Sequence, residues 1–194
     1  MTTSKFAAQL TAQIGEEFAA HHQYLAIAAH YESMTLPQLA GFFYRQAAEE
    51  RGHAMMMVQY LLDRGESYEV SAIEAPRNAF ESPLDAYKAA QAHEVKVTGQ
   101  IEALFHAARE ENDPLGEQFI LWFLREQVEE VANMDTLVTI ARRADDDWFR
   151  IEEFLARESD SSSNTSTPPA VAGGAVGAAE RGGARERGVR AGVP

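Results

Sequence analysis

The sequence predicts an all-α protein, a four-helix bundle with one long crossover between its second and third helices and a short fifth helix near the C-terminal end. Three observations lead to this prediction. Four long segments repeat apolar residues in steps of three and four, which is the period of a helix with one buried face. Glycine and proline are few before residue 158. Short connections join the four segments into two pairs, and a longer connection separates the pairs.

The first helix is expected over residues 4–32. Its buried stripe mixes apolar side chains with a carboxylate, a histidine and two tyrosines. The stripe consists of Phe6, Leu10, Ile14, Glu17, His21, Tyr24, Ala28 and Tyr31.

The second helix should begin around Thr35-Leu36-Pro37-Gln38, which follows the capping-box pattern and places proline in the first turn. It should end near Gly65, because glycine commonly follows the last turn of a helix. Its stripe consists of Leu39, Phe43, Gln46, Glu50, His53, Met57 and Tyr60.

The third and fourth helices should begin at Ser82-Pro83 and at Asp113-Pro114, where a capping side chain precedes a proline at the first helical position. The third stripe consists of Tyr87, Ala90, Glu94, Val97, Ile101, Leu104 and Ala108. The fourth stripe consists of Ile120, Phe123, Gln127, Glu130, Met134, Leu137 and Ala141. A short fifth helix is expected over 145–157, with apolar Trp148, Ile151, Phe154 and Leu155.

The connection over residues 65–82 determines the expected topology. A helix of about 30 residues is roughly 45 Å long, and eighteen extended residues can span roughly 60 Å. This connection can therefore run the length of the bundle, which makes the second and third helices parallel, whereas the short connections make each pair an antiparallel hairpin.

The chain divides by composition into a bundle over residues 1–157 and a tail over 158–194. The tail is rich in Ser, Thr, Gly, Ala, Pro and Arg and holds no aromatic residue, so we expect it to be disordered.

The net charge of −13 disfavours nucleic acid as a partner of the bundle. No apolar run is long enough for a membrane span, and no signal peptide is visible. Cysteine is absent, which excludes disulfides and thiolate sites. These features predict a cytoplasmic protein.

Polar groups on the four stripes repeat at matched intervals. Glu17 precedes Glu50 by 33 residues and His53 by 36, and Glu94 precedes Gln127 by 33 residues. Glu130 follows Glu94 by 36 residues. Each hairpin should bring its groups to one height, and several buried acids side by side are costly unless a cation neutralises them.

Ligand chemistry narrows the choice of cation. Four carboxylates with one imidazole suit iron or manganese, and zinc would supply no redox chemistry. A single Glu-x-x-His pair on a helix would be a weak signal, because most such pairs lie on a solvated face. Acids on the core stripes of four helices, where no arginine accompanies them, are a much stronger signal.

At these residues the chain resembles the haem-free bacterial ferritins, the non-haem members of the ferritin-like di-iron family. The resemblance covers about residues 4–157. It rests on Gly15-Glu16-Glu17-Phe18, Gln23-Tyr24-Leu25, Glu49-Glu50-Arg51-Gly52-His53, His93-Glu94 and Trp122-Phe123-Leu124-Arg125-Glu126-Gln127-Val128-Glu129-Glu130.

The resemblance implies a di-iron centre. The first iron would be held by Glu17, Glu50 and His53, and the second by Glu50, Glu94 and Glu130. Gln127 would be a near-site group that contacts oxygen species or the second iron, and Tyr24 would hydrogen-bond within the centre, although a core role suits Tyr24 equally well. A third iron would be held by Glu49, Glu126 and Glu129 together with Glu130. Glu49, Glu126 and Glu129 could each equally be an ordinary exposed acid on a helix.

At several positions this sequence differs from the patterns of related protein families, and these differences bear on haem binding and on iron entry. Arg51, beside Gly52, stands where a bacterioferritin has its haem-ligating methionine, so we expect no haem. A rubrerythrin would add a four-cysteine iron site. Glu117 matches one acid of the family's three-fold channel, but Ile120 stands where a second acid is common, which leaves the route of iron entry open.

The family forms hollow shells of 24 subunits that oxidise Fe²⁺ to Fe³⁺ with O₂ or peroxide and store ferric mineral. The resemblance implies this ferroxidase and iron-storage role for a homo-oligomer here. Two alternatives are a stand-alone di-iron carboxylate oxidase, which would need an apolar pocket beside the metals, and a non-catalytic DNA-protecting shell protein. The tail could be a solvated extension, a docking peptide for a larger protein compartment, or a plug at a symmetry axis.

Overall fold

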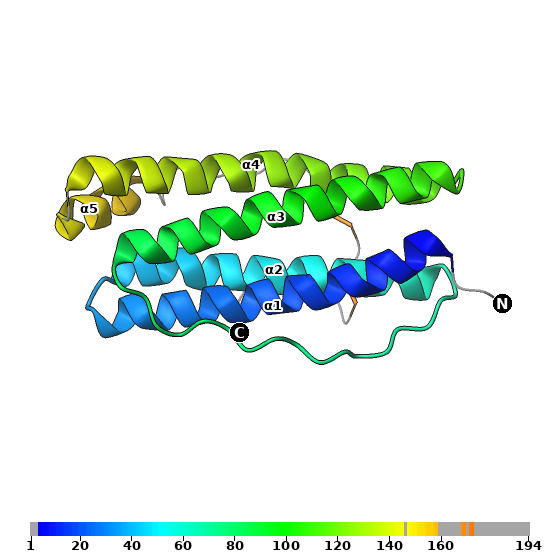
Figure 1. Cartoon of the computed structure of the whole chain (residues 1–194), viewed down its shortest axis with the longest axis horizontal. Helices are drawn as coiled ribbons and strands as arrows, with labels where there is room; N and C mark the ends of the chain where they lie inside the picture. The colour runs from blue at the N-terminus through cyan, green and yellow to red at the C-terminus, as the bar shows by residue number, and fades with distance from the viewer. Residues whose placement is uncertain (1–3, 146, 159–167, 170, 173–194) are drawn as a thin grey trace, which may run out of the picture.

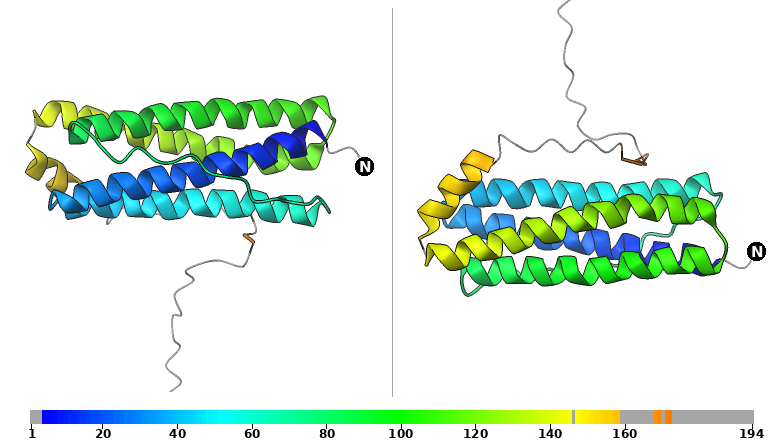
Figure 2. Two further views of the ribbon diagram at one scale, coloured as in Figure 1. Left: turned by 60° about the horizontal axis from the view of Figure 1, so that its bottom comes forward. Right: turned by 90° about the horizontal axis from the view of Figure 1, so that it is seen from above.

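Five α-helices make up the described part of the chain. The computed structural model describes residues 4–145, 147–158, 168–169 and 171–172, and no strand occurs in these ranges. The helices are α1 (Lys5–Ser33), α2 (Pro37–Asp63), α3 (Pro83–Glu110), α4 (Pro114–Ala144) and α5 (Trp148–Glu158). The first four lie side by side along one axis, and α5 crosses one end of the bundle (Figures 1 and 2). The predicted all-α class, with four long helices and a short fifth, is confirmed.

Side-chain caps start three of the long helices. Ser4 Oγ accepts a hydrogen bond from the backbone N–H of Ala7 at the start of α1. Ser82 caps α3 and Asp113 caps α4 in the same way. The two predicted Ser/Asp-Pro starts are thus confirmed, because a short oxygen-bearing side chain satisfies a backbone donor that has no partner inside the helix.

The predicted capping box at Thr35 is wrong. Thr35 has φ +60 and belongs to the turn that ends α1, where Leu36 N–H bonds to the carbonyl of Tyr31. Leu36 precedes the helix instead and makes no side-chain cap. The free donors at the start of α2 are satisfied from a distant element, since Glu152 of α5 accepts hydrogen bonds from the backbone N–H groups of Gln38 and Leu39 at 2.9 and 2.8 Å.

The crossover between Asp63 and Pro83 runs from one end of the bundle to the other, so that α2 and α3 are parallel (Figure 1). It is tied to α1 at Gln23, whose side-chain amide donates to the carbonyl of Arg77 at 3.0 Å and accepts from its N–H at 2.9 Å. Arg77 also pairs with Asp85 in the first turn of α3. The predicted crossover topology is confirmed.

The core consists of two apolar clusters. One lies towards α5 and includes Tyr24, Tyr31, Phe43 and Tyr87, and the other lies towards the opposite end and includes Leu10. Between them, at mid-length of α1 to α4, comes a set of buried polar side chains. This polar layer consists of Gln13, Glu17, Gln46, Glu50, His53, Glu94, Glu126, Gln127 and Glu130.

Only four residues beyond α5 belong to the described part of the chain. The backbone N–H of Ala172 donates to the carbonyl of Met55 on α2 at 3.2 Å, and Val171 and Ala172 pack against the second apolar cluster. The expectation of a disordered tail over 158–194 falls almost entirely outside the described residues. Within them, no helix is long and apolar enough to cross a membrane.

Candidate metal centre

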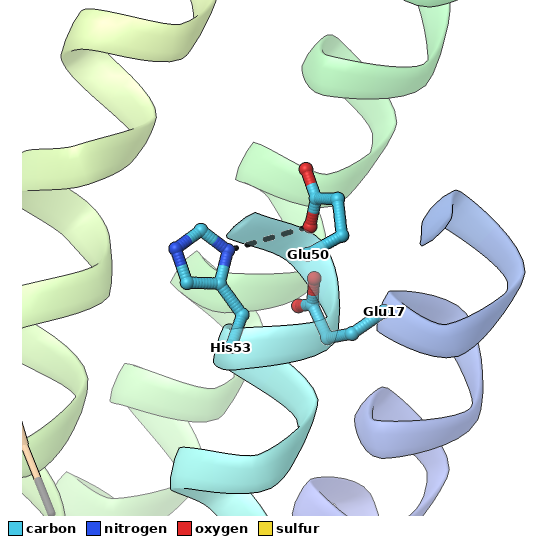
Figure 3. Close-up of side chains that lie close together, drawn as sticks. All are labelled: Glu17, Glu50 and His53. Carbon is cyan, nitrogen blue, oxygen red and sulfur yellow. Dashed lines mark hydrogen bonds and ion pairs between the residues drawn. The ribbon is translucent and has the colours of Figure 1, made fainter. Parts of the chain in front are cut away.

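Three side chains from α1 and α2 form the most compact group of metal-ligand type in the described residues. Glu17, Glu50 and His53 each offer a ligand atom, and these atoms all lie within 4.8 Å of one another. Figure 3 shows the two carboxylates and the imidazole turned towards a common point. The spacing of three residues places Glu50 and His53 on one face of α2, with His53 Nδ1 3.3 Å from Glu50 Oε2.

All three side chains are buried, with exposed fractions of 3% or less. Burial raises the pKa of Glu17 well above its ordinary value, and the neighbouring Glu50 raises it further. Gln13, one turn earlier on α1, donates its amide to Glu17 Oε1 at 2.9 Å, whereas Glu17 Oε2 has no hydrogen-bond partner. The group therefore contains a buried carboxylate oxygen that receives no hydrogen bond from the protein.

A second group comes from α3 and α4. Tyr24 on α1 donates its phenol hydroxyl to Glu94 Oε1, and Glu94 Oε2 has no partner. Thr98 Oγ1 lies 2.9 Å from Gln127 Oε1. Burial raises the pKa of Glu94 to about 7, against the lowering effect of the Tyr24 hydrogen bond.

Glu130 completes this second group on α4. Burial raises its pKa to about 9, and the charges of Glu49 and Glu94 add to the shift, while a hydrogen bond from Gln46 opposes it. Glu130 Oε2, like Oε2 of Glu17 and Oε2 of Glu94, is buried without a partner.

Glu50 is the electrostatic link between the two groups. Burial raises its pKa well above the ordinary value, and the charges of Glu94 and Glu130 raise it further, against a lowering contribution from Glu17. Such shifts arise when several carboxylates compete for charge in a site from which water is excluded. Two divalent cations would carry the four positive charges that four ionised carboxylates require.

The sequence-predicted third site is partly assembled. Glu126 is buried, whereas Glu49 and Glu129 are exposed on their helices. Gln46 donates to Glu49 Oε2 at 2.9 Å. The charge of Glu129 contributes to the raised pKa of Glu130, so both exposed acids lie close to the centre without forming a closed cluster.

A cavity of about 250 Å³ reaches the centre between α2 and α4. Trp122 and Phe123 pack edge-on against the His53 ring, with ring centroids 5.7 Å away in each case. The cavity is lined by Glu49, Gly52, His53, Met56, Trp122, Glu126 and Pro168.

Other residues singled out in the sequence lie away from the centre. Glu117 pairs with Arg109 near the end of the bundle, at 3.4 Å. His21 Nδ1 contacts the carbonyl of Ala47 at 2.6 Å.

Sequence reasoning did not assign a site role to three residues that lie at the centre, Gln13, Gln46 and Thr98. Each stands four residues from a candidate ligand on the same helix, Gln13 before Glu17, Gln46 before Glu50 and Thr98 after Glu94. Residues four apart share a helix face, and this spacing is the signal that could have found them.

Comparison with known proteins places this geometry in context. Residues 7–144 match the family model of the ferritin-like domain. The chain is 52% identical over 173 residues to ferritin BfrB of Mycolicibacterium smegmatis, covering 89% of this chain and 96% of that protein. It is 35% identical over 155 residues to a bacterial non-heme ferritin of Staphylococcus haemolyticus, covering 78% and 93%. An open pore ferritin from Archaeoglobus fulgidus superposes with a TM-score of 0.78 at 30% identity, covering 82% and 98%.

Proposed function

This chain belongs to the ferritin family, and we propose that it oxidises Fe²⁺ at the buried polar layer and stores the Fe³⁺ as mineral inside a shell of its own copies. Relatives are named as ferritins and non-heme ferritins, which supports iron storage. The ferroxidase step is proposed from the chain's own residues.

One observation carries the proposal. Glu17, Glu94 and Glu130 each hold an oxygen that is buried and without a hydrogen-bond partner. Leaving a buried acceptor unsatisfied costs roughly 1–3 kcal/mol, and more when it is charged. Three such oxygens in one layer are therefore expected to have a ligand, and a pair of cations satisfies all of them.

The roles of the residues follow from their positions. Glu17 and His53 hold the first Fe²⁺, and Glu94 and Glu130 hold the second. Glu50 interacts with both groups and would be the carboxylate that the two ions share. Iron binding requires ionised carboxylates, so it displaces protons, above all from Glu130 with its pKa of about 9.

The reaction is an electron transfer between two substrates. Two Fe²⁺ ions give up one electron each, and O₂ takes these two electrons and two protons to leave as H₂O₂. A peroxide that takes two electrons and two protons instead becomes two waters. The chain holds both ions close enough to serve one oxidant, and its carboxylates stabilise the added charge of Fe³⁺.

The proposal also covers a third iron site, the absence of haem and the assembly of the chain into a shell. Glu49, Glu126 and Glu129 would hold a third iron with Glu130, which their position beside the centre supports. Arg51 in place of a haem-ligating methionine supports a haem-free protein. The shell of 24 copies and the cytoplasmic location are taken from the family resemblance.

Replacement of the bridging carboxylate tests the ferroxidase assignment. Wild-type protein should bind two Fe²⁺ per chain in an anaerobic calorimetric titration before oxidation is started with O₂. Glu50→Ala should lose rapid oxidation by at least about a hundredfold, since changes to groups that only support ligands already cost about 10- to 100-fold. His53→Ala should slow it less, because the carboxylates remain.

Glu102→Ala serves as the matched control, because this acid is exposed on α3 away from the centre. It should bind and oxidise iron like the wild type, and all variants should keep their helical circular dichroism. Unchanged oxidation in Glu50→Ala would refute the bridging role.

A further inference from the structure

Met56 on α2 lines the cavity of about 250 Å³ between α2 and α4, which His53 and Trp122 also line. Met56 stands three residues after His53, so both side chains lie on one face of the helix. It is 8% exposed and belongs to the second apolar cluster. This thioether side chain therefore borders the space beside a proposed ligand of the first iron and is largely shielded from bulk solvent.

The cavity suits a small polar molecule. A water molecule occupies about 30 Å³ in the liquid, so a molecule as small as hydrogen peroxide fits inside. The wall includes the carboxylate side chains of Glu49 and Glu126 as well as apolar Met56. Trp122, in the same wall, has an indole N–H that is buried without a hydrogen-bond partner. Buried donors rarely stay unpaired, so this one favours a small acceptor such as peroxide.

The proposed reaction releases hydrogen peroxide next to this cavity. His53 holds the first iron in that reaction and lines the cavity as well, so a product set free at this ion meets Met56. Peroxide oxidises methionine sulfur to the sulfoxide. The chain has no cysteine, so methionine supplies its only sulfur atoms.

We propose that Met56 is a modification site at which the chain traps hydrogen peroxide formed at its own metal centre and becomes methionine sulfoxide. The sulfur lone pair attacks one peroxide oxygen, the O–O bond breaks, and an S–O bond forms. The hydrogen on the transferred oxygen passes to the departing hydroxide, which leaves as water. Sulfur loses two electrons and the peroxide gains them. This inference rests on the proposed function, because that reaction supplies the peroxide.

The other methionines serve as internal standards. Met34, directly after α1, is 41% exposed and does not line the cavity. Peroxide in solution should therefore reach Met34 before Met56. Met57 and Met134 are fully buried in the apolar clusters and should react least. The position of the sulfoxide thus reports whether the peroxide came from solution or from the centre.

The test loads full-length protein with two Fe²⁺ per chain under nitrogen and then admits O₂, with catalase present to destroy peroxide that reaches solution. Peptide mass spectrometry measures the sulfoxide at each methionine. The ratio of Met56 to Met34 sulfoxide should be higher after this reaction than in metal-free protein treated with added H₂O₂. Protein loaded with Zn²⁺ should form no sulfoxide under O₂ at Met56, because zinc performs no redox chemistry.

Two leucine variants test the trapping role. Met56→Leu nearly conserves the side-chain volume but removes the sulfur, so more oxygen should be incorporated into Trp122 during the same reaction. Met55→Leu is the matched control, because its neighbouring side chain does not line the cavity. It should keep the wild-type level of Met56 sulfoxide and the wild-type rate of iron oxidation. Unchanged oxidation of Trp122 in Met56→Leu would overturn the trap.

The outcomes separate this proposal from the proposed function. If the wild type oxidises Fe²⁺ but the sulfoxide ratio equals that with added H₂O₂, the trap is wrong and the proposed function stands. Oxidation spread equally over Met56, His53 and Trp122 would indicate hydroxyl radicals and would also contradict the two-electron step. If the wild type does not oxidise Fe²⁺, the proposed function fails, and the trap falls with it because no peroxide is formed.

Discussion

The phenol hydroxyl of Tyr24 on α1 donates a hydrogen bond to Glu94 Oε1 on α3, which joins the two hairpins at the height of the metal centre. The hydroxyl is buried, and burial together with the charge of Glu94 raises the pKa of Tyr24 well above its ordinary value. Tyr24 therefore remains a neutral donor at physiological pH.

Tyr24→Phe should weaken metal binding at the second position in a pH-dependent way. The hydrogen bond from Tyr24 lowers the pKa of Glu94, which stands at about 7 with that bond in place. Without the bond, Glu94 should lose its proton only at higher pH, so the midpoint of Co²⁺ binding at the second position should move upward. Binding curves between pH 6 and 8 measure this shift. An unchanged midpoint would show that Tyr24 is only a packing residue.

The metal-free protein should lose stability as the pH rises. Burial raises the pKa of Glu94 to about 7 and that of Glu130 to about 9, from an ordinary value of 4.5. A group whose pKa is higher in the folded than in the unfolded protein stabilises the fold. This stabilisation is complete at pH values below the unfolded-state pKa, and it is lost as the pH rises through the folded-state pKa. Each group contributes a slope of at most about 1.4 kcal/mol per pH unit.

Thermal melting of metal-free protein from pH 5 to 9 measures this loss. Glu130→Gln should flatten the upper part of the curve between about pH 7 and 9, because the amide has no proton to lose. Bound Mn²⁺ should raise the melting temperature most at high pH. A Glu130→Gln curve parallel to the wild type would contradict the assignment.

Glu152→Ala should destabilise the fold without disturbing the metal centre. The carboxylate of Glu152 accepts from the first free N–H groups of α2, and the loss of such a cap costs about 0.5–2 kcal/mol. Glu153→Ala changes an exposed acid on the same helix and is the matched control. Denaturant unfolding should separate the two variants, while both keep wild-type iron oxidation.

Purified protein should show no Soret absorption band. Arg51 occupies the position where a bacterioferritin has its haem-ligating methionine, and a charged guanidinium is no haem ligand. Expression with added haem precursor gives the most stringent conditions, and a band that persists after gel filtration would overturn the haem-free assignment.

Deletion of residues 159–194 should leave the bundle folded, because α1 to α5 and both apolar clusters are almost complete without them. The change in free energy of unfolding should stay within about 1 kcal/mol, a typical value for the loss of one hydrogen bond. Pro168, which lines a cavity together with Trp122, would be lost, so tryptophan emission should change. Native mass and iron uptake would then show whether the tail serves assembly, docking or neither.

Much of the fold could be predicted from the sequence, because the sequence patterns that specify helices and their caps are local. The stripes with a period near 3.6 predicted four helices that begin within one or two residues of the observed starts, and the Ser82 and Asp113 caps were correctly placed. The cap at Thr35 failed for a physical reason. The pattern there is real, but the turn that ends α1 holds Thr35 at φ +60, and a residue in that conformation cannot begin the next helix.

Matched intervals pointed to six side chains from α1 to α4, and all six are buried in the polar layer. The signal exists because a hairpin of two straight helices relates residues at one height by a fixed spacing. The assignment of these side chains as metal ligands stays a prediction. Gln13, Gln46 and Thr98 were not assigned a site role, because an amide or hydroxyl on a helix face is common and only its partner reveals its role.

The sequence by itself determined that this chain forms a helical bundle and that its carboxylates face the core, because helical periodicity is a property of neighbouring residues. Tertiary structure alone decided which carboxylate oxygens remain without a donor, that Thr98 contacts Gln127, and that Glu152 caps α2. These relationships join distant segments and depend on how each helix is rotated and offset against its neighbours. The packing of the whole core determines these rotations and offsets, and no local sequence pattern predicts them.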